Sequence, residues 1–172
     1  MTFAARLLHR MDLGDRHLLD RWAIDDEASR VVRRFWIGVT HAGGAVVTIG
    51  SVLVPVMFQW WPRTLSIRAG MALTISHLMV QLVKRRICRE RPSATPIVRC
   101  PDQFSFPSGH ATAALAVAAS YAISFPGVAV ALVTFALLVG WSRVVLGVHY
   151  PGDVAVGQMI ALATVGGLAA MR

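Results

Sequence analysis

Long stretches without a charged side chain constrain this chain more than any other feature of its sequence. Four runs lack Asp, Glu, Lys and Arg altogether, namely residues 35–62, 71–83, 111–142 and 154–171. A helix that crosses a bilayer needs about 20 mostly apolar residues. Charged residues make up only 15% of the sequence, whereas an ordinary soluble domain contains about 25%. A soluble helical bundle would have to hide all four runs, so we expect an all-α, polytopic membrane helical bundle.

These runs are long enough for about five transmembrane helices. The run 111–142 is interpreted as a hairpin of two helices, because Pro126-Gly127 near its middle is a turn signal. Trp60, Trp61 and Pro62 end the first run, and aromatic residues commonly anchor a helix at the membrane interface. The five expected spans are Ile37–Trp60, Leu65–Val83, Ser108–Phe125, Gly127–Leu146 and Val154–Ala170.

Residues 1–34 are expected to form an amphipathic, interfacial segment ahead of a transmembrane domain of residues 35–172. Charges interrupt this segment throughout, so no secretory signal peptide is expected. Helices of this pattern often lie in the plane of the membrane surface, but a solvated helix that packs on its own protein fits equally well. Two apolar sets each share a helical face: Phe3, Leu7, Leu8 and Met11, and Leu18, Leu19 and Trp22.

The net charge of +8 does not indicate a nucleic-acid partner. No recognition motif accompanies it, and basic residues at the ends of spans orient a membrane protein and attract anionic membrane lipids. If the spans alternate in direction, residues 1–34, 84–107 and 143–153 share one face of the membrane. All seventeen Lys and Arg residues belong near that face except Arg63, Arg68 and Arg172.

Three polar clusters lie on this shared face, and the first is KRRICRERP, from Lys84 to Pro92. Lys84 is the only lysine in the chain and follows directly from the second expected span. The cluster also contains three arginines that we interpret as a basic helix end, namely Arg85, Arg86 and Arg89.

A polar stripe precedes this cluster on the same expected helix. Thr74, His77 and Gln81 are spaced by three or four residues from one another and from Lys84, so their side chains share one helical face. We interpret His77 and Gln81 as polar packing between helices.

The second cluster is PSGH, from Pro107 to His110. Proline followed by small residues suits the first turn of a helix, and the free backbone N–H groups of such a turn form an anion site. Ser108 adds a hydroxyl donor, and Gly109 allows an oxyanion to approach the backbone closely. His110 is therefore expected where a bound phosphate would lie.

The third cluster is SRVVLGVHYPGD, from Ser142 to Asp153. Asp153 lies four residues beyond His149, close enough to accept a hydrogen bond from one imidazole nitrogen. A carboxylate in this place fixes the tautomer and leaves the other nitrogen free as a nucleophile. Taken singly, His149 could be a snorkelling interfacial residue, and Asp153 could complement the dipole of the last helix.

Together the clusters predict metal-free phosphoryl transfer without a cofactor. A hydrolytic metal centre usually has several His and acidic ligands, and the only carboxylate here apart from Glu90 is Asp153. His149 is predicted to attack phosphorus and form a phosphohistidine, while Asp153 stabilises the imidazolium. His110 is predicted to protonate the leaving oxygen and then to activate water. The predicted ligands of the equatorial oxygens are Lys84, Arg91, Ser108, Gly109 and Arg143.

The order and spacing of the clusters resemble the signature of the type 2 phosphatidic acid phosphatase superfamily. The matching motifs are Lys84-x6-Arg91-Pro92, Pro107-Ser108-Gly109-His110 and Ser142-Arg143-x5-His149-x3-Asp153. That superfamily includes membrane lipid phosphate phosphatases, glucose-6-phosphatase and the vanadium haloperoxidases. The resemblance implies that His149 is the nucleophile, His110 the acid and Asp153 the partner of the nucleophile. Many relatives have six spans, which differs from the five counted here.

The expected substrate is a lipid phosphate. Each half of the run 111–142 rises only about 24 Å at 1.5 Å per residue, less than the ~30 Å hydrocarbon core, so the catalytic groups should lie near the level of the lipid headgroups. Candidate substrates are phosphatidic acid, phosphatidylglycerol phosphate, or a polyprenyl phosphate or diphosphate such as undecaprenyl diphosphate.

The expected location is a bacterial inner membrane, with the chain crossing it several times. The distribution of basic residues favours a cytoplasmic site. Many relatives of the resembled family work on the opposite side, where Cys88 and Cys100 could form a disulfide, but two reduced thiols fit the sequence equally well.

Three alternatives to hydrolysis remain. A vanadate-dependent haloperoxidase would use the same ligands, although the spans and the short chain argue against it. A transferase would pass the phosphoryl group to an alcohol other than water. A lipid-binding or transport module without catalysis is disfavoured, because every predicted catalytic residue is present.

Overall fold

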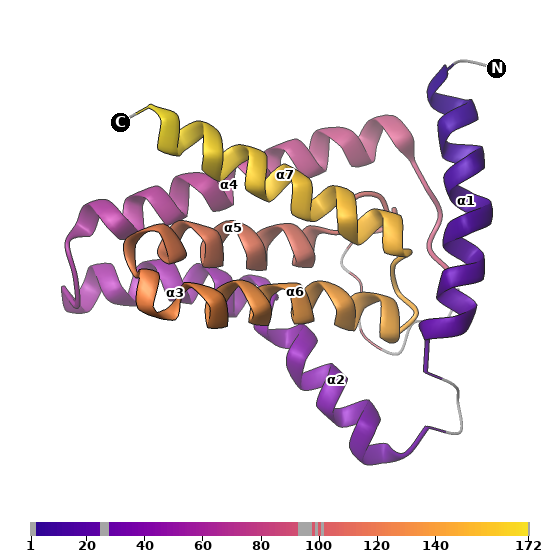
Figure 1. Ribbon diagram of the computed structural model, residues 1–172, viewed down its shortest axis with the longest axis horizontal. Coiled ribbons are helices and arrows are strands. Elements are labelled where there is room, and N and C mark those ends of the chain that lie inside the picture. The colour runs from indigo at the N-terminus through magenta and orange to yellow at the C-terminus, as the bar shows by residue number, and fades with distance from the viewer. Residues whose placement is uncertain (1–2, 25–27, 93–97, 99, 101, 172) are drawn as a thin grey trace.

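The chain folds as a bundle of helices in the computed structural model (Figure 1), which describes residues 3–24, 28–92, 98, 100 and 102–171, with side chains from residue 12 onward. The helices in this part of the chain are α1 (Phe3–Trp22), α2 (Arg30–Ala42), α3 (Ala45–Phe58), α4 (Arg63–Ile87), α5 (Gly109–Ser124), the 3₁₀ turn η1 (Pro126–Val128), α6 (Ala129–Val145) and α7 (Pro151–Ala170). The described residues contain no strand, so the predicted all-α fold is confirmed.

Three helical segments among the described residues are long and apolar enough to cross a membrane. They are α4, α7 and the segment Pro126–Val145 that joins η1 to α6. The bent pair α2–α3 makes a fourth span if it is counted as one. The remaining expected span, Ser108–Phe125, corresponds to α5, whose 16 residues rise only about 24 Å. The expected polytopic membrane bundle is confirmed, but α5 is shorter than the helices that qualify as spans.

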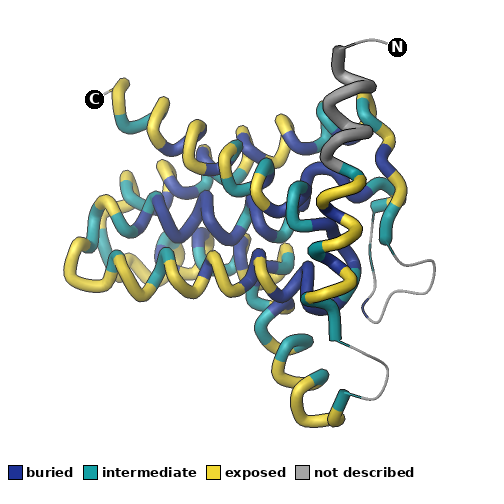
Figure 2. Tube along the Cα trace, turned by 45° about the vertical axis from the view of Figure 1, so that its right-hand side comes forward, coloured by how far each residue is buried: buried dark blue, intermediate teal, exposed yellow. Residues whose placement is uncertain are grey.

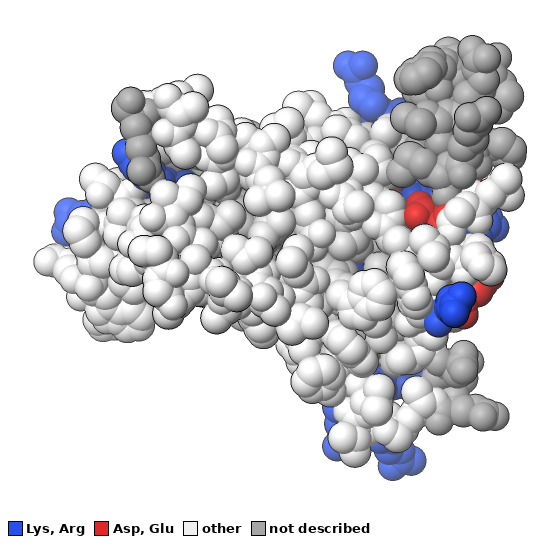
Figure 3. Space-filling model, in the orientation of Figure 1, with Lys and Arg blue, Asp and Glu red and all other residues white. Residues whose placement is uncertain are grey.

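Helix α5 forms the centre of the bundle (Figure 2). It packs against α4, α6 and α7, and Ala111 and Ala116 on it are completely buried. Small side chains of this kind allow neighbouring helices to approach closely within a membrane. Large apolar side chains of the outer helices point outward instead, as Val46, Leu82 and Val130 do. Figure 3 shows the resulting uncharged band over the middle of the visible face, which suits contact with lipid.

The expected span Ile37–Trp60 is bent in the structure. The structure divides this segment into α2 and α3, with a bend of 46° between them. Gly43 lies at the break, where a Cβ atom would overlap the Val139 side chain of α6 and would lie 3.2 Å from the His110 carbonyl oxygen. The backbone passes this close to α5 and α6 only because no side chain is present. Helix α2 therefore turns away from the bundle (Figure 1).

Helix α1 lies across one end of the bundle (Figure 1). Leu19 belongs to a buried cluster that includes Val144 and Tyr150, and the ring of Trp22 lies 4.8 Å from that of Trp141. This apolar face of α1 therefore packs on the protein itself. The other expected face consists of side chains outside the described residues, namely those of Phe3, Leu7, Leu8 and Met11.

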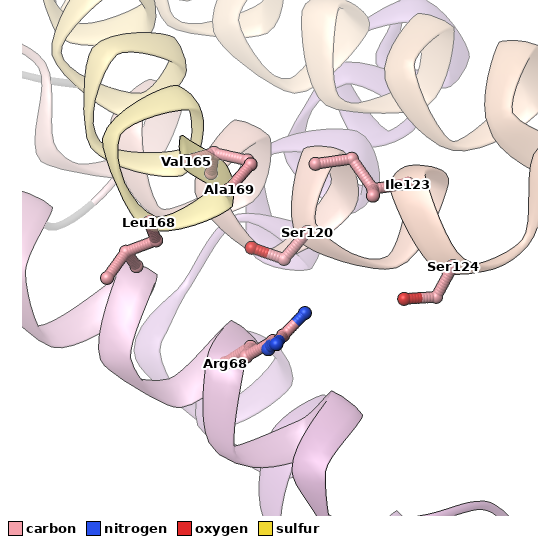
Figure 4. A pocket seen from close by; sticks show the side chains of 7 residues that line it. All are labelled: Arg68, Ser120, Ile123, Ser124, Val165, Leu168 and Ala169. Atoms are coloured by element: carbon pink, nitrogen blue, oxygen red, sulfur yellow. The ribbon is translucent and has the colours of Figure 1, made fainter. Parts of the chain in front are cut away.

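Arg68 lies at the opposite end of the bundle, as expected for a residue near one end of the second span. Its side chain extends from α4 into a shallow pocket that it shares with Ser120 and Ser124 of α5 and Val165 of α7 (Figure 4). Long basic side chains reach the membrane interface in this way while their stems remain against apolar surface.

The close packing of α5 and α7 predicts the effect of one added methyl group. A Cβ atom on Gly157 of α7 would lie 2.7 Å from the Ser108 carbonyl oxygen and 2.7 Å from Thr112 Oγ1. Gly157→Ala should therefore lower the free energy of unfolding by about 1–3 kcal/mol, because a backbone atom must shift. Thermal unfolding in detergent micelles measures this loss. Gly166→Ala on the same helix is the control, since nothing lies within 4 Å of its Cβ position; equal melting temperatures would contradict the packing.

Candidate active site

The three polar clusters meet at the end of the bundle that α1 crosses. Arg91 of the first cluster donates a hydrogen bond from Nη1 to His149 Nε2 of the third, over 3.1 Å. The backbone N–H of Ser108 in the second cluster donates to the Asp153 carbonyl oxygen at 2.9 Å. Segments more than forty residues apart in the sequence therefore form one site.

His149 lies in the short loop between α6 and α7. Gly147 in this loop has a φ of +65°, a left-handed conformation that glycine adopts without steric cost. The backbone N–H groups of Val148 and His149 both donate to the Arg143 carbonyl oxygen, at 3.1 and 3.2 Å. The end of α6 thus holds the imidazole in place, and only 2% of the His149 surface is exposed.

Asp153 lies in the first turn of α7 and is completely buried. Its Oδ2 accepts a hydrogen bond from the Tyr150 N–H at 2.9 Å, as in a capping box. The same oxygen lies 3.4 Å from His149 Nδ1. This separation is longer than a well-formed hydrogen bond, and such contacts in ligand-free sites commonly shorten when substrate binds. His149 Nδ1 has no hydrogen-bond partner among the described residues, so the predicted hydrogen bond from His149 to Asp153 stays a prediction.

The hydrogen bond from Arg91 identifies the tautomer of His149, whose Nδ1 has no hydrogen-bond partner among the described residues. Arginine can only donate, so Nε2, which faces Arg91, must carry the lone pair, and the proton is on Nδ1 toward Asp153. Burial, together with the charges of Arg143 and Arg91, lowers the pKa of His149 well below its ordinary 6.5. The imidazole is therefore neutral near pH 7, with Nε2 available as a nucleophile.

Two cations from different helices are buried in the site. Lys84, at the end of α4, donates from Nζ to the Phe104 carbonyl oxygen at 2.9 Å and lies 3.0 Å from Asp102 Oδ2. Arg143 of α6 donates from Nη1 to Thr40 Oγ1 of α2 at 2.7 Å. Arg143 is only 1% exposed, and its Nε has no hydrogen-bond partner among the described residues.

Ser108 is the N-cap residue of α5, and Gly109 is the first residue of that helix. Ser108 is completely buried, and its hydroxyl has no hydrogen-bond partner in the described part of the chain. A Cβ atom on Gly109 would meet only Val80, at 4.0 Å, so the protein leaves open space beside this backbone. The first N–H groups of a helix have no partner within the helix, and together with the serine hydroxyl they suit an anion.

Arg89 contacts the carboxylates of the site, whereas the sequence analysis interpreted it only as part of a basic helix end. Its Nη1 donates to Asp153 Oδ1 at 2.7 Å. Its Nη2 lies 2.6 Å from Asp12 Oδ1 and 2.8 Å from Asp15 Oδ2, both on α1. Asp15 Oδ1 in turn accepts a hydrogen bond from the Gly152 N–H at 2.8 Å. Arg89 therefore links α1 to the carboxylate that faces His149.

Local spacing could not reveal this link, because the partners of Arg89 are 64 and more residues away in the sequence. One signal was available. Asp12 and Asp15 lie three residues apart on one face of an amphipathic helix, and such a pair of acids requires a basic partner if that face packs on protein.

The interpretation of His77 and Gln81 as polar packing between helices is wrong. Both side chains line an open groove of about 460 Å³ between α3, α4 and α5, which also reaches His110. Gln81 Nε2 lies 3.5 Å from His77 Nε2, and no other side-chain bond is described for either residue. The residues therefore face a space that a ligand could enter.

The two cysteines are free thiols, exposed at Cys88 and half-buried at Cys100. Among the residues that the structure describes, no three His, Cys, Asp or Glu side chains come together in a way that could hold a metal ion.

Comparisons with known proteins agree with the family that the sequence motifs resemble. The sequence model of the PAP2 superfamily, the family that the three motifs resemble, matches residues 65–172. Decaprenylphosphoryl-5-phosphoribose phosphatase of Mycobacterium tuberculosis H37Rv is 38% identical over 142 residues, covering 76% of this chain and 75% of that protein. Lipid A 1-phosphatase of Rhizobium etli is 39% identical over 94 residues, covering 49% of this chain and 40% of that protein.

A solved structure has the same fold. The transmembrane PAP2-type phosphatidylglycerolphosphate phosphatase of Bacillus subtilis superposes with a TM-score of 0.79 at 23% identity, covering 99% of this chain and 87% of that one. The likeness extends over α1 and α2, for which the sequence contained no family motif.

The Arg89 network predicts a specific loss of stability. Arg89→Met would leave the buried carboxylates of Asp15 and Asp153 without their cation, which typically costs about 3–5 kcal/mol. Thermal unfolding in detergent should show this loss, and hydrogen exchange should show faster opening of α1. Arg86→Met is the matched control, because Arg86 is exposed in the last turn of α4, just before Arg89 in the chain. If both variants melt at the temperature of the unmodified protein, the network does not hold α1 in place.

Proposed function

The chain belongs to the PAP2 superfamily and is a membrane phosphatase of the lipid phosphate type, and we propose that it hydrolyses a lipid or polyprenyl phosphate through a phosphohistidine without a metal ion. Phosphomonoesters and diphosphates are both substrates in this proposal. The basic ends of α2 and α4 lie at the same end of the bundle as the site, and by the positive-inside rule we assign that end to the cytoplasmic face of a bacterial inner membrane.

One observation carries the proposal. Ser108 Oγ and Arg143 Nε are buried donors without a partner among the described residues, and both belong to the motifs that contain the two histidines. A buried donor that makes no hydrogen bond costs about 1–3 kcal/mol, and each such group in a native site requires an explanation. Oxygens of a bound phosphate would satisfy both donors, and the cations of Lys84 and Arg91 lie beside them.

In the first step, His149 Nε2 attacks phosphorus and forms an N–P bond. The bond between phosphorus and the leaving oxygen breaks, its electron pair stays on that oxygen, and His110 supplies the proton. The dianionic phosphate favours the protonated form of His110 that this step requires. Asp153 stabilises the positive charge that develops on the His149 ring through Nδ1–H. Arg91 gives up its bond to Nε2 and donates to the phosphate instead.

In the second step, His110 takes a proton from water, and the water oxygen attacks the phosphohistidine. The N–P bond breaks, and inorganic phosphate leaves a neutral His149. In both steps hydrogen-bond donors of the protein stabilise the charge on the equatorial oxygens. These donors are Lys84, Arg91, Ser108, the Gly109 N–H and Arg143.

The proposal predicts that phosphate release depends on one histidine. Purified protein in detergent should release phosphate from lipid phosphomonoesters in the presence of a chelator. His149→Ala should reduce kcat on the order of 10³-fold or more, because the nucleophile is lost. Brief reaction with a ³²P-labelled substrate followed by denaturation should leave an acid-labile label on the chain. His17→Ala, an exposed histidine of α1, is the control and should retain full activity.

Substantial activity in His149→Ala would refute the nucleophile. Loss of all activity on chelation, restored by a divalent cation, would refute the metal-free reaction.

A further inference from the structure

Three carboxylates share the guanidinium of Arg89. Asp153 Oδ1 lies 2.7 Å from its Nη1, whereas Asp12 Oδ1 and Asp15 Oδ2 lie 2.6 and 2.8 Å from its Nη2. The side chains of Arg89, Asp15 and Asp153 are at most 8% exposed, so salt and water screen their charges only weakly. Arg16 also lies 4.0 Å from Asp12, but it is 66% exposed and offsets little charge. One buried cation therefore faces three anions.

Arg89 by itself would weaken the part that Asp153 plays in the proposed mechanism. A positive charge develops on His149 in the first step, and Asp153 Oδ2 lies 3.4 Å from His149 Nδ1. A guanidinium that neutralises the same carboxylate at Oδ1 reduces its attraction for that charge, because a close ion pair acts on its surroundings as a dipole and not as an anion. Burial and the charges of Arg143 and Arg91 already oppose a positive His149. The reaction therefore benefits from any further anion that takes up the charge of Arg89.

Helix α1 supplies two such anions. Asp12 and Asp15 contact the guanidinium at Nη2, and they leave only Nη1 to Asp153. Asp15 also accepts a hydrogen bond at Oδ1 from the N–H of Gly152, the residue directly before Asp153, at 2.8 Å. Asp15 therefore contacts both the cation that pairs with the site carboxylate and the backbone from which that carboxylate projects.

We infer that Asp12 and Asp15 are positioning residues of the reaction: by sharing the charge of Arg89 they leave the negative charge of Asp153 available to the His149 ring. The inference rests on the proposed function, because only a nucleophilic His149 becomes positive in the first step. Helix α1 then takes part in catalysis without touching the phosphate, although the three site motifs lie between residues 84 and 153.

Asparagine variants test this inference, because they remove the charge of an acid and keep an oxygen that accepts hydrogen bonds. The measurement is the single-turnover rate at which ³²P from a saturating labelled dodecyl phosphate attaches to the chain. Asp15→Asn should lower this rate about tenfold and change KM by no more than about twofold, since the lost charge acts only when His149 becomes positive. Asp12→Asn should lower it about threefold, because Asp12 is more exposed. Asp12→Glu, which keeps the charge, should stay within about twofold of the unmodified protein.

A triple variant separates the effect of charge from that of structure. In Asp12→Asn/Asp15→Asn, Arg89 and Asp153 neutralise each other, and labelling should be slower than in either single variant. Adding Arg89→Gln removes the remaining cation and exposes His149 to the charge of Asp153 again, so the rate should recover by about threefold or more. A purely structural role predicts a further loss, because one more contact of the network is removed.

Asp20→Asn is the matched control, since Asp20 is an exposed acid on the same helix, and it should label at the unmodified rate. An unchanged rate in Asp15→Asn would overturn the inference, and so would a folded triple variant that is slower than the double variant. If the triple variant does not fold, equal rates in Asp12→Asn and Asp12→Glu would overturn it. In all these cases the unmodified protein still becomes labelled, and the proposed function stands. No label on the folded, unmodified protein would overturn the proposed function itself.

Discussion

One buried carboxylate joins the elements on which the site depends. Asp153 accepts hydrogen bonds from Arg89 at Oδ1 and from the Tyr150 N–H at Oδ2, and its carbonyl oxygen accepts one from the Ser108 N–H. These bonds connect the chain after α4, the start of α7 and the start of α5. A buried carboxylate without such partners is strongly destabilising, so these segments come together in one arrangement and bring the three polar clusters with them.

The polar groups around this carboxylate fall into two sets. The first set is joined by ion pairs within the protein: Arg89 lies within 2.8 Å of carboxylate oxygens of Asp12, Asp15 and Asp153 and so connects the helix ends. The second set contains Ser108 Oγ and Arg143 Nε, which have no partner among the described residues. Because the first set fixes the position of the second, binding of a tetrahedral anion would require little reorganisation, which is the condition for efficient electrostatic catalysis.

Much of this arrangement could be predicted from the sequence, because the membrane imposes long charge-free runs and the site motifs are short and local. The features that could not be predicted depend on distant contacts. The break at Gly43 follows from the position of Val139 on α6, and glycines within an apolar run do not reveal it. The partners of Arg89 lie on α1 and α7. The groove beside His77 is lined jointly by residues of α3, α4 and α5, which lie far apart in the sequence.

A structure of the protein with bound orthovanadate, a five-coordinate mimic of the transferring phosphoryl group, tests the central claim most directly. If His149 is the nucleophile, vanadium should lie at bonding distance from its Nε2. Vanadate oxygens should also lie within hydrogen-bond distance of Ser108 Oγ and Arg143 Nε, with Arg91 turned from the imidazole to the anion. Vanadate bound elsewhere, or held in the site while His149 Nε2 still faces Arg91, would contradict this claim.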